Sequence, residues 1–538
     1  MKALVIILGL TIFIRFFNIS SLPAGLYWDE LDTGYQAYSL LQTGRDYFGN
    51  LFPAHLQAFA DYRSGLYMYL AVPLVKIFGL SPLSVRGVSS VWSVITVLLS
   101  YIFAARILRL GRNSWILPAV MSLAPWGLIQ GRIAAESQLL VPLLFLGLIS
   151  LYATRYSLSA VSFALSLWAY PTAKLFIPVF ILILFIVYKP NLKKMILPAL
   201  LFLAIGFLPI YETFTKPIGR RFAELSIFSD PTVKKQVETN RQISYLSSGA
   251  VYQPGLQPGL IDKIIYNKYT LLGQKLITNY FTPLSTDFLF IKGDPNLRHN
   301  LNLVNTGQFY LIDLLPFVLG LVYVLSNLRA ISHKLLASWL FLAPLPAIFT
   351  SDGSTHAPRL IFMFPVIAII ISLGLHRLFR SKLAAAGYVS IFCLTIFITF
   401  QYLFTTYRAV SAEAFNHGFL AAVTEATRRK GEYRKVILDM YNESALMAYL
   451  FDSKYPPAEF QKSFPLEAET IFNGVEGYKF ENIIILYPGT RDWNKIQLPG
   501  KNLIFARSTQ PNATKIPGAE FITNPDSSPA IVKFTQNN

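Results

Sequence analysis

Two groups of acidic residues in this sequence are suited to acid–base chemistry, and the first is Asp29-Glu30. The pair lies in the segment 27–32, just after an apolar run, where two adjacent carboxylates close to a bilayer need a reason. One reason is catalysis, because a carboxylate can take the proton of an attacking hydroxyl. The structural alternative is helix capping, with Asp29 as the N-cap of a surface helix over residues 30–42.

Glu136 is the second acidic candidate. It follows Arg132 by four residues, so the two side chains would share one face of a helix at the end of an apolar run. Ionisable groups are costly at the lipid boundary and are often functional there. A structural ion pair that closes a helix corner is the alternative. A divalent metal shared by Asp29 and Glu136 is a further alternative, and no metal or other cofactor is predicted.

Basic residues that could bind an anion also lie at the ends of apolar runs. Arg63, ahead of an apolar helix, would offer a fork of donors beside backbone N–H groups, which suits a phosphate. Three further cationic candidates stand where the head group of an anionic lipid would lie; they are Lys174, His356 and Arg359. The alternatives are a snorkelling surface arginine at position 63 and ordinary interface anchoring at the other three.

Several other kinds of site are excluded by the sequence. Cys393 is the only cysteine, which excludes a disulfide scaffold and a cysteine-based zinc site. The six histidines are scattered, and no two have the H-x-x-x-H spacing of metal ligands. Neither G-x-x-x-x-G-K-[ST] nor G-x-G-x-x-G occurs, so no ATP or dinucleotide site is expected.

The elements that must position these residues are membrane spans. Of the 538 residues, 53% are hydrophobic and only 14% are charged, where a soluble domain has about 25% charged residues. A span needs about 20 apolar residues. The segment 66–80 contains Pro73 and Lys76, so we expect a juxtamembrane or re-entrant helix there and not a span. About eleven segments are predicted to span the membrane: 3–19, 84–105, 114–131, 137–153, 157–171, 175–188, 195–211, 308–326, 335–350, 360–375 and 384–405.

The distribution of charge gives these spans an orientation. The chain has a net charge of +18, and its short basic loops contain Lys and Arg but no Asp or Glu. The positive-inside rule places such loops in the cytoplasm, together with the N-terminus. The excess charge is then a topology signal, and nucleic acid is not an expected partner. A multi-pass plasma-membrane protein with every polar cluster on its outer side follows. The basic inner loops are 106–113, 154–156, 189–194, 327–334 and 376–383.

Two domains are predicted from this pattern. Residues 1–405 form a transmembrane domain whose long outer loops are 20–83 and 212–307. Residues 406–538 are enough for one small domain outside the membrane. Its helical stretches near 412–429 and 443–451 alternate with strand-like segments, which predicts an α/β fold. The strand-like segments are 436–440, 482–486, 502–506 and 530–534.

The order and the common side of these motifs resemble the membrane glycosyltransferases of the GT-C class, in particular the protein O-mannosyltransferase and aminoarabinose-transferase-like group. Trp28-Asp29-Glu30 stands where such enzymes carry a D-E motif. Five further segments resemble stretches of this family: 62–67, 81–86, 124–136, 170–174 and 356–359. The stretch 288–310 resembles the large outer loop of bacterial members. Two departures are Arg63-Ser64-Gly65 in place of Lys-Pro-Pro and Glu136 where Asp is common.

The resemblance implies a reaction. A sugar would pass from a polyprenyl-phosphate donor in the bilayer to an acceptor on the outer face, which could be a protein, a lipid or a glycan. Asp29 would be the general base, Glu30 would belong to the same catalytic motif, and Glu136 would orient the acceptor or hold Arg132. Cations would bind the leaving phosphate. The residues implied for that role are Arg63, Arg132, Lys174, His356 and Arg359.

Two alternatives come from other functional classes. A transporter or flippase of lipid-linked glycans would need ionisable residues near the middle of the bilayer and inverted repeats, and the sequence shows neither. The second alternative is a non-catalytic membrane scaffold that presents residues 406–538. In that case, replacement of Asp29 would have no effect on any sugar transfer.

Overall fold

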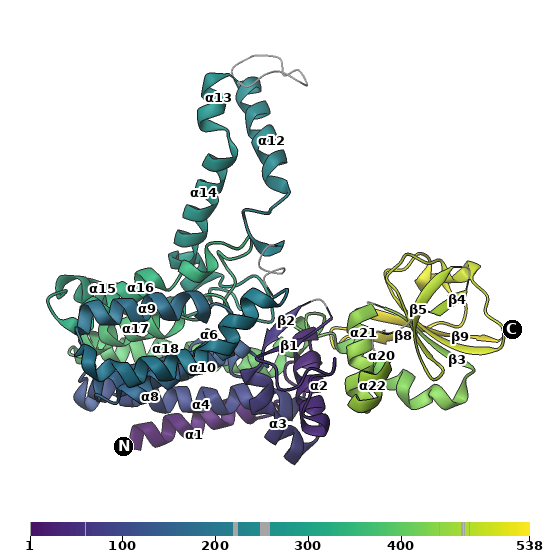
Figure 1. Ribbon diagram of the computed structural model, residues 1–538, viewed down its shortest axis with the longest axis horizontal. Helices are drawn as coiled ribbons and strands as arrows, with labels where there is room; N and C mark the ends of the chain where they lie inside the picture. The colour runs from purple at the N-terminus through teal and green to yellow at the C-terminus, as the bar shows by residue number, and fades with distance from the viewer. Residues whose placement is uncertain are drawn as a thin grey trace. The chain divides into compact units, whose positions relative to one another are not determined.

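The computed structural model describes residues 2–59, 61–218, 224–247, 259–440, 442–463, 466, 469–472 and 474–537. These residues form two compact units, which we call unit 1 and unit 2. Unit 1 comprises residues 1–98, 127–139 and 390–538, and unit 2 comprises residues 99–126 and 140–389. The predicted mostly helical fold with a C-terminal sheet is confirmed (Figure 1).

Helices occupy every predicted span, and in the described residues three are long and apolar enough to cross a membrane. These three are Pro82–Arg106 (α4), Leu192–Thr215 (η3 with α10) and Lys382–Thr405 (α18). The remaining apolar helices are shorter, so the count of eleven stays a prediction. They are α1 Lys2–Phe16, α3 Leu66–Phe78, α5 Ile116–Leu123, α6 Pro125–Gln130, α7 Leu140–Tyr152, α8 Tyr156–Ala169, α9 Ala173–Tyr188, α15 Leu314–Ser326, α16 Ile331–Leu342 and α17 Met363–Leu378.

The predicted span 114–131 is one place where the structure differs in detail. It consists of two helices, α5 and α6, that meet at Ala124-Pro125. Pro125 has no backbone N–H and disfavours helical geometry at the residue before it, so the helix ends there. Ala124 has a ψ of 138°, outside the helical range.

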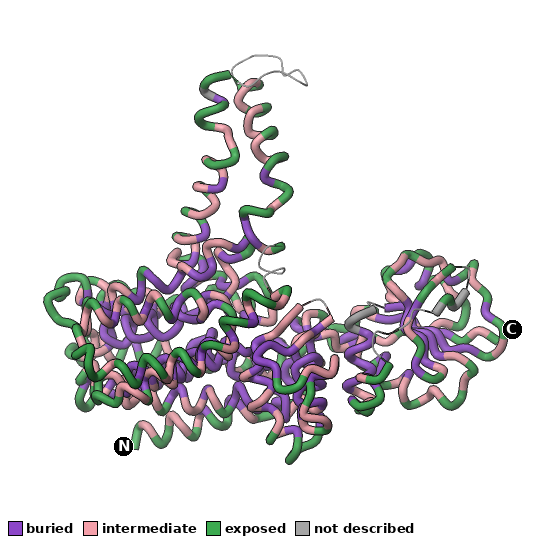
Figure 2. The backbone as a smooth tube through the Cα atoms, viewed as in Figure 1, coloured by how far each residue is buried: buried purple, intermediate pink, exposed green. Residues whose placement is uncertain are grey.

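Unit 2 is organised around helix α17. Its residues 363–375 are all buried, whereas much of α10 is exposed (Figure 2). The exposed residues of α10 include the large apolar Leu203 and Phe207. An apolar outer surface of this kind is expected of helices that face lipid. Helix α15 packs closely on α17, because a Cβ added at Gly320 would collide with the carbonyl of Ile370. Small residues allow this approach of two backbones in membrane proteins.

The long loop 212–307 contains helices of its own. Helices α12 (Thr232–Ser247) and α14 (Lys268–Phe281) pack beside one another, with the short α13 (Leu260–Ile265) between them in sequence (Figure 1). At their base, the ammonium of Lys275 pairs with Asp230 at 2.7 Å.

The C-terminal part of unit 1 is a mixed seven-stranded sheet with the order β4-β5-β6-β3-β7-β9-β8. The three central strands, β6, β3 and β7, are parallel and almost entirely buried. Such burial is typical of parallel strands whose faces are covered by helices. The predicted strands at β3, β6, β7 and β9 are present; β4, β5 and β8 and helix α22 were not foreseen. The elements are α19 Tyr407–Val410, α20 His417–Arg429, β3 Lys435–Asp439, α21 Asn442–Asp452, α22 Pro457–Ser463, β4 Glu469–Phe472, β5 Val475–Phe480, β6 Ile483–Leu486, β7 Lys501–Arg507, β8 Glu520–Thr523 and β9 Pro529–Asn537.

Candidate active site

Asp29 lies in the first turn of helix α2 (Trp28–Thr43). The predicted helix over 30–42 therefore begins earlier, and the N-cap is Tyr27 and not Asp29. The backbone N–H of Tyr27 donates to the carboxylate of Glu30 at 3.4 Å, which ties the start of the helix to its third residue. The Asp29 side chain is 40% exposed, so it remains accessible from outside the protein.

Arg63 joins Asp29 to two other carboxylates. Its Nη1 lies 3.3 Å from Asp29 Oδ1 and 3.4 Å from Asp32 Oδ2, and its Nη2 lies 2.6 Å from Glu136 Oε1. The same Nη1 donates to the backbone carbonyl of Asp29 at 3.0 Å. The Asp32 side chain is 0% exposed, those of Glu136 and Arg63 are 6% and 10% exposed, and that of Asp29 is the most exposed at 40%. We call these four residues the carboxylate cluster.

A small hairpin positions Arg63. Strand β2 (Tyr62–Ser64) pairs antiparallel with β1 (His55–Gln57), so that Arg63 stands opposite Leu56. The N–H of Gly65 donates to the carbonyl of Ala54 at 2.9 Å. A Cβ at position 65 would lie only 2.9 Å from the Ala54 carbonyl oxygen, so the chain can turn into α3 here only with glycine.

Asp32 is the member of the cluster that sequence reasoning did not select. Its side chain points inward and accepts a hydrogen bond from the hydroxyl of Tyr47 at 2.7 Å. Burial raises the pKa of Asp32 to about 6, although Arg63 and the Tyr47 hydrogen bond act in the opposite direction. Burial opposes the charge of Arg63, but its carboxylate neighbours raise its pKa well above the usual value.

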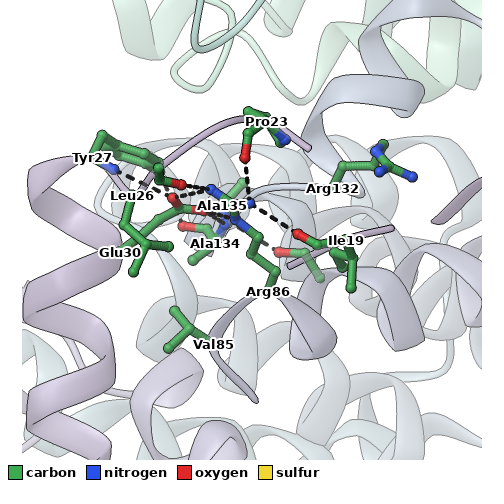
Figure 3. Close-up of polar contacts among 12 residues, drawn as sticks. Ile19, Pro23, Leu26, Tyr27, Glu30, Val85, Arg86, Arg132, Ala134 and Ala135 are labelled. Atoms are coloured by element: carbon green, nitrogen blue, oxygen red, sulfur yellow. Dashed lines mark hydrogen bonds and ion pairs between the residues drawn. The ribbon is translucent and has the colours of Figure 1, made fainter. Parts of the chain in front are cut away.

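Glu30, next to Asp29 in sequence, has a different environment (Figure 3). Its two oxygens accept from Nε and Nη2 of Arg86, each at 2.8 Å, and from the N–H of Ala134 at 3.1 Å. The remaining donors of Arg86 reach the carbonyls of Ile19, Pro23 and Gly25. Both side chains of this bidentate pair are 0% exposed. The pair therefore fixes the loop between α1 and α2 against α4.

Arg132 and Glu136 do not share the expected helix face, and they do not form the ion pair that was the structural alternative. Residues 131–134 form turns, so the expected helix face does not exist, and Glu136 pairs with Arg63 instead. The guanidinium of Arg132 donates to backbone carbonyls at and just after the C-terminal end of α1, those of Ile14, Phe17 and Leu22. The carbonyl of Ile14 is one of the acceptors that a helix end leaves without intrahelical partners. Arg132 is fully buried there.

The other predicted cations belong to unit 2. Lys174, at the start of α9, donates to Thr213 Oγ1 of α10 at 2.9 Å. Arg359 donates to Thr350 at 3.0 Å and pairs with the half-exposed Asp352. The ring of His356 is buried, and burial together with the charge of Arg359 lowers its pKa to about 4.

His356 stands in a second polar group that the sequence did not single out as a site. Its ring lies 4.9 Å from that of His299, whose Nδ1 is 2.8 Å from Asp294 Oδ2. The same carboxylate oxygen accepts from the N–H of Ala357 at 2.8 Å, which joins the loop before α15 to the loop before α17. Burial opposes ionisation of Asp294, but its partner His299 and the N–H of Ala357 favour the carboxylate, and the pKa of Asp294 is lowered overall.

The residues do not fit the metal that Asp29 and Glu136 could have shared. The cation between these two carboxylates is the guanidinium of Arg63. Within the ranges that the structure describes, no three His, Cys, Asp or Glu side chains are grouped so as to hold a metal ion.

Comparison with known proteins gives a likeness in fold. No protein-family model matches the sequence, and no curated protein is significantly similar to it. ArnT of Cupriavidus metallidurans, in a crystal structure with bound undecaprenyl phosphate, is 10% identical and aligns over 98% of this chain and 97% of its own, with a TM-score of 0.53. The oligosaccharyltransferase AglB of Archaeoglobus fulgidus, in complex with an inhibitory peptide and a dolichol-phosphate, is 12% identical over 83% of this chain and 63% of its own, with a TM-score of 0.48. The chain therefore shares the fold of ArnT over nearly its whole length.

Proposed function

We propose that the protein is a glycosyltransferase that moves a sugar from a polyprenyl-phosphate donor to an acceptor on the outer face of the plasma membrane. The ArnT fold supports this proposal, and the observation that carries it is the carboxylate cluster. Three carboxylates and one guanidinium are gathered near the predicted membrane surface, and Asp29 is the most exposed of these four side chains. A donor whose lipid tail lies in the bilayer would approach such a site without a nucleotide-binding pocket.

Asp29 is our candidate for the general base. It would accept the proton of the acceptor hydroxyl or amine as that group attacks the sugar. Its place in the first turn of α2 and its contact with Arg63 fix the carboxylate in one orientation. Arg63 Nη1 lies beside this exposed carboxylate, so a phosphate bound next to Asp29 would reach the guanidinium as well. Glu136 holds the other end of Arg63.

The environments of Glu30 and Arg132 favour a different role from direct contact with substrate. Both side chains are 0% exposed; Glu30 accepts from Arg86 of α4, and Arg132 donates to backbone carbonyls between residues 14 and 22. We therefore assign both to positioning the start of α2. Lys174, His356 and Arg359 remain proposed contacts for the phosphate; with its lowered pKa, His356 would be a neutral hydrogen-bonding group at pH 7.

Replacement of Asp29 by Asn tests the proposal. Membranes or liposomes that contain the protein would be given a panel of polyprenyl-phosphate sugars, and consumption of each donor would be measured. We expect the wild type to consume one donor and Asp29→Asn to lose at least about 100-fold in kcat, the usual contribution of a general base. The substitution is nearly isosteric at an exposed side chain, so the thermal midpoint should change little.

The matched control is Asp526→Asn, which removes an exposed carboxylate of unit 1 outside the cluster. It should keep full activity. Equal donor consumption by Asp29→Asn and the wild type would refute the assignment of the base. Movement of intact donor across the bilayer without consumption would favour the flippase alternative, and neither activity with any donor would favour the scaffold.

A further inference from the structure

A buried tyrosine, Tyr47, connects the carboxylate cluster to the C-terminal part of unit 1, residues 406–538, which we call the C-terminal domain. The hydroxyl of Tyr47 donates to Oδ1 of Asp32, and Oδ2 of Asp32 lies 3.4 Å from the Arg63 guanidinium that contacts Asp29. Tyr47 and Asp32 are both 0% exposed. Buried hydrogen bonds to a charged group are strong and directional, so the orientation of Asp32 depends on this hydroxyl.

The ring of Tyr47 is packed within aromatic side chains from distant parts of the chain. Its centroid lies 5.7 Å from that of Tyr35, 4.7 Å from Phe48 and 5.8 Å from Phe59. A fourth ring, Phe460, lies 5.9 Å away in an edge-to-face arrangement. Phe460 belongs to helix α22 of the C-terminal region and is itself fully buried.

Helix α22 is fixed to α2 by more than this ring. The side-chain amide of Gln461 donates to Ser39 Oγ at 3.1 Å, to Thr43 Oγ1 at 3.0 Å and to the carbonyl of Asp46 at 2.9 Å. The Tyr35 hydroxyl donates to the carbonyl of Tyr455 at 3.0 Å. These contacts place the C-terminal region on the side of α2 from which Tyr47 approaches Asp32.

We propose that Tyr47, held by Phe460 of the C-terminal domain, is a positioning residue that orients the carboxylate cluster for catalysis through Asp32. The inference rests on the proposed function and gives the C-terminal domain a part in it. The path runs from Phe460 to Tyr47, Asp32, Arg63 and Asp29, and every step is a contact between described side chains of unit 1.

The pH profile is the readout that separates positioning from packing. The charged and titratable groups that face Asp32 are Tyr47, Arg63 and Asp29, and Glu136 faces Arg63 from the other side. Since the Tyr47 hydrogen bond lowers the pKa of Asp32, its removal should raise that pKa from about 6. A hydrogen bond to a charged group corresponds to about one pKa unit.

The test compares Tyr47→Phe with Tyr35→Phe in the donor-consumption assay. Both changes remove one buried tyrosine hydroxyl from the same aromatic cluster, but only Tyr47 reaches Asp32. We expect Tyr47→Phe to lower kcat and kcat/KM together by about tenfold. Because the pKa of Asp32 rises in this variant, the acid limb of the pH–activity profile should move upward by about one pH unit. Tyr35→Phe should leave that limb in place. An unmoved limb in Tyr47→Phe would overturn the proposal.

The contribution of the C-terminal domain is tested with Phe460→Ala, which should show the same upward movement of the acid limb. Phe521→Ala removes a ring of the same domain that is 45% exposed, and it should behave as the wild type. If Phe460→Ala lowers the thermal midpoint but leaves the profile unchanged, the domain has only a structural role and this part of the proposal fails.

A second measurement needs no donor and separates this inference from the proposed function. The thermal midpoint of the purified protein would be measured at pH 5, where Asp32 is mostly protonated, and at pH 8, where it is ionised. A hydrogen bond to an ionised carboxylate is roughly twice as strong as one to a neutral group. Tyr47→Phe should therefore lower the midpoint more at pH 8 than at pH 5, and Tyr35→Phe equally at both. Equal losses for Tyr47→Phe would overturn the placement of its hydroxyl on Asp32, even if no sugar were transferred.

Discussion

Two adjacent residues, Asp29 and Glu30, have opposite environments in this protein. The exposed Asp29 shares Arg63 with two other carboxylates. Glu30 is enclosed with Arg86, and every donor of that guanidinium is used. One carboxylate of the pair can meet a substrate, and the other holds the backbone that presents it.

Replacement of Glu30 by Gln should therefore act mainly by lowering the stability of the fold and not by removing a catalytic group. The amide cannot compensate the charge of Arg86, and breaking a buried ion pair from one side costs about 3–5 kcal/mol. We expect a strongly lowered thermal midpoint for Glu30→Gln, where Asp29→Asn changes it little. If Glu30→Gln retained the wild-type midpoint and lost only activity, the catalytic role first expected for Glu30 would be favoured.

The sequence could point to Asp29, Arg63 and Glu136 because each stands at the end of an apolar run. It could not separate Glu30 from Asp29, since the partner Arg86 lies 56 positions away in the chain. It also missed Asp32, whose burial depends on Tyr47 and Arg63 folding over it. The helix face expected to carry both Arg132 and Glu136 was wrong because it assumed a continuous helix through residues that form turns.

At the scale of elements, hydrophobic patterning was the more reliable guide. Helices occupy all eleven predicted spans, and the juxtamembrane segment is a helix (Leu66–Phe78). Strands β3, β6, β7 and β9 carry long apolar runs and were predictable. The missed strands β4, β5 and β8 lie at or near the edges of the sheet, where fewer residues are buried and the apolar signal is weak.

Close helix packing in unit 2 leads to a prediction at this scale. Gly320→Leu would push a side chain into the carbonyl of Ile370, where the α17 backbone cannot move away. We expect a loss of about 3 kcal/mol in stability from this overpacking, measured as a lowered thermal midpoint. Gly387→Leu is the control, because a Cβ at that position of α18 has no atom within 4 Å. Equal midpoints for the two variants would contradict the close approach of α15 and α17.

At the scale of the whole molecule, the predicted topology can be tested with the single native cysteine. In a Cys393→Ala background, Thr509→Cys would report on the C-terminal domain and Ser381→Cys on a basic loop; both positions are exposed. We expect a membrane-impermeant maleimide to label Thr509→Cys on intact cells and Ser381→Cys only after permeabilisation. The reverse pattern would invert the topology and place the carboxylate cluster in the cytoplasm.

The composition of unit 1 has a consequence for the order in which the protein can mature. This unit combines residues 1–98 with residues 390–538, so the helix that carries Asp29 packs against a region made more than 400 residues later. Chains fold from the N-terminus as they are synthesised. Phe460 and Gln461 reach their places around Tyr47 and α2 only after residue 461 has been synthesised. A chain truncated before residue 460 and inserted in the membrane would therefore present Asp29 without these supporting contacts, and only a chain that includes Phe460 and Gln461 would acquire an assembled site.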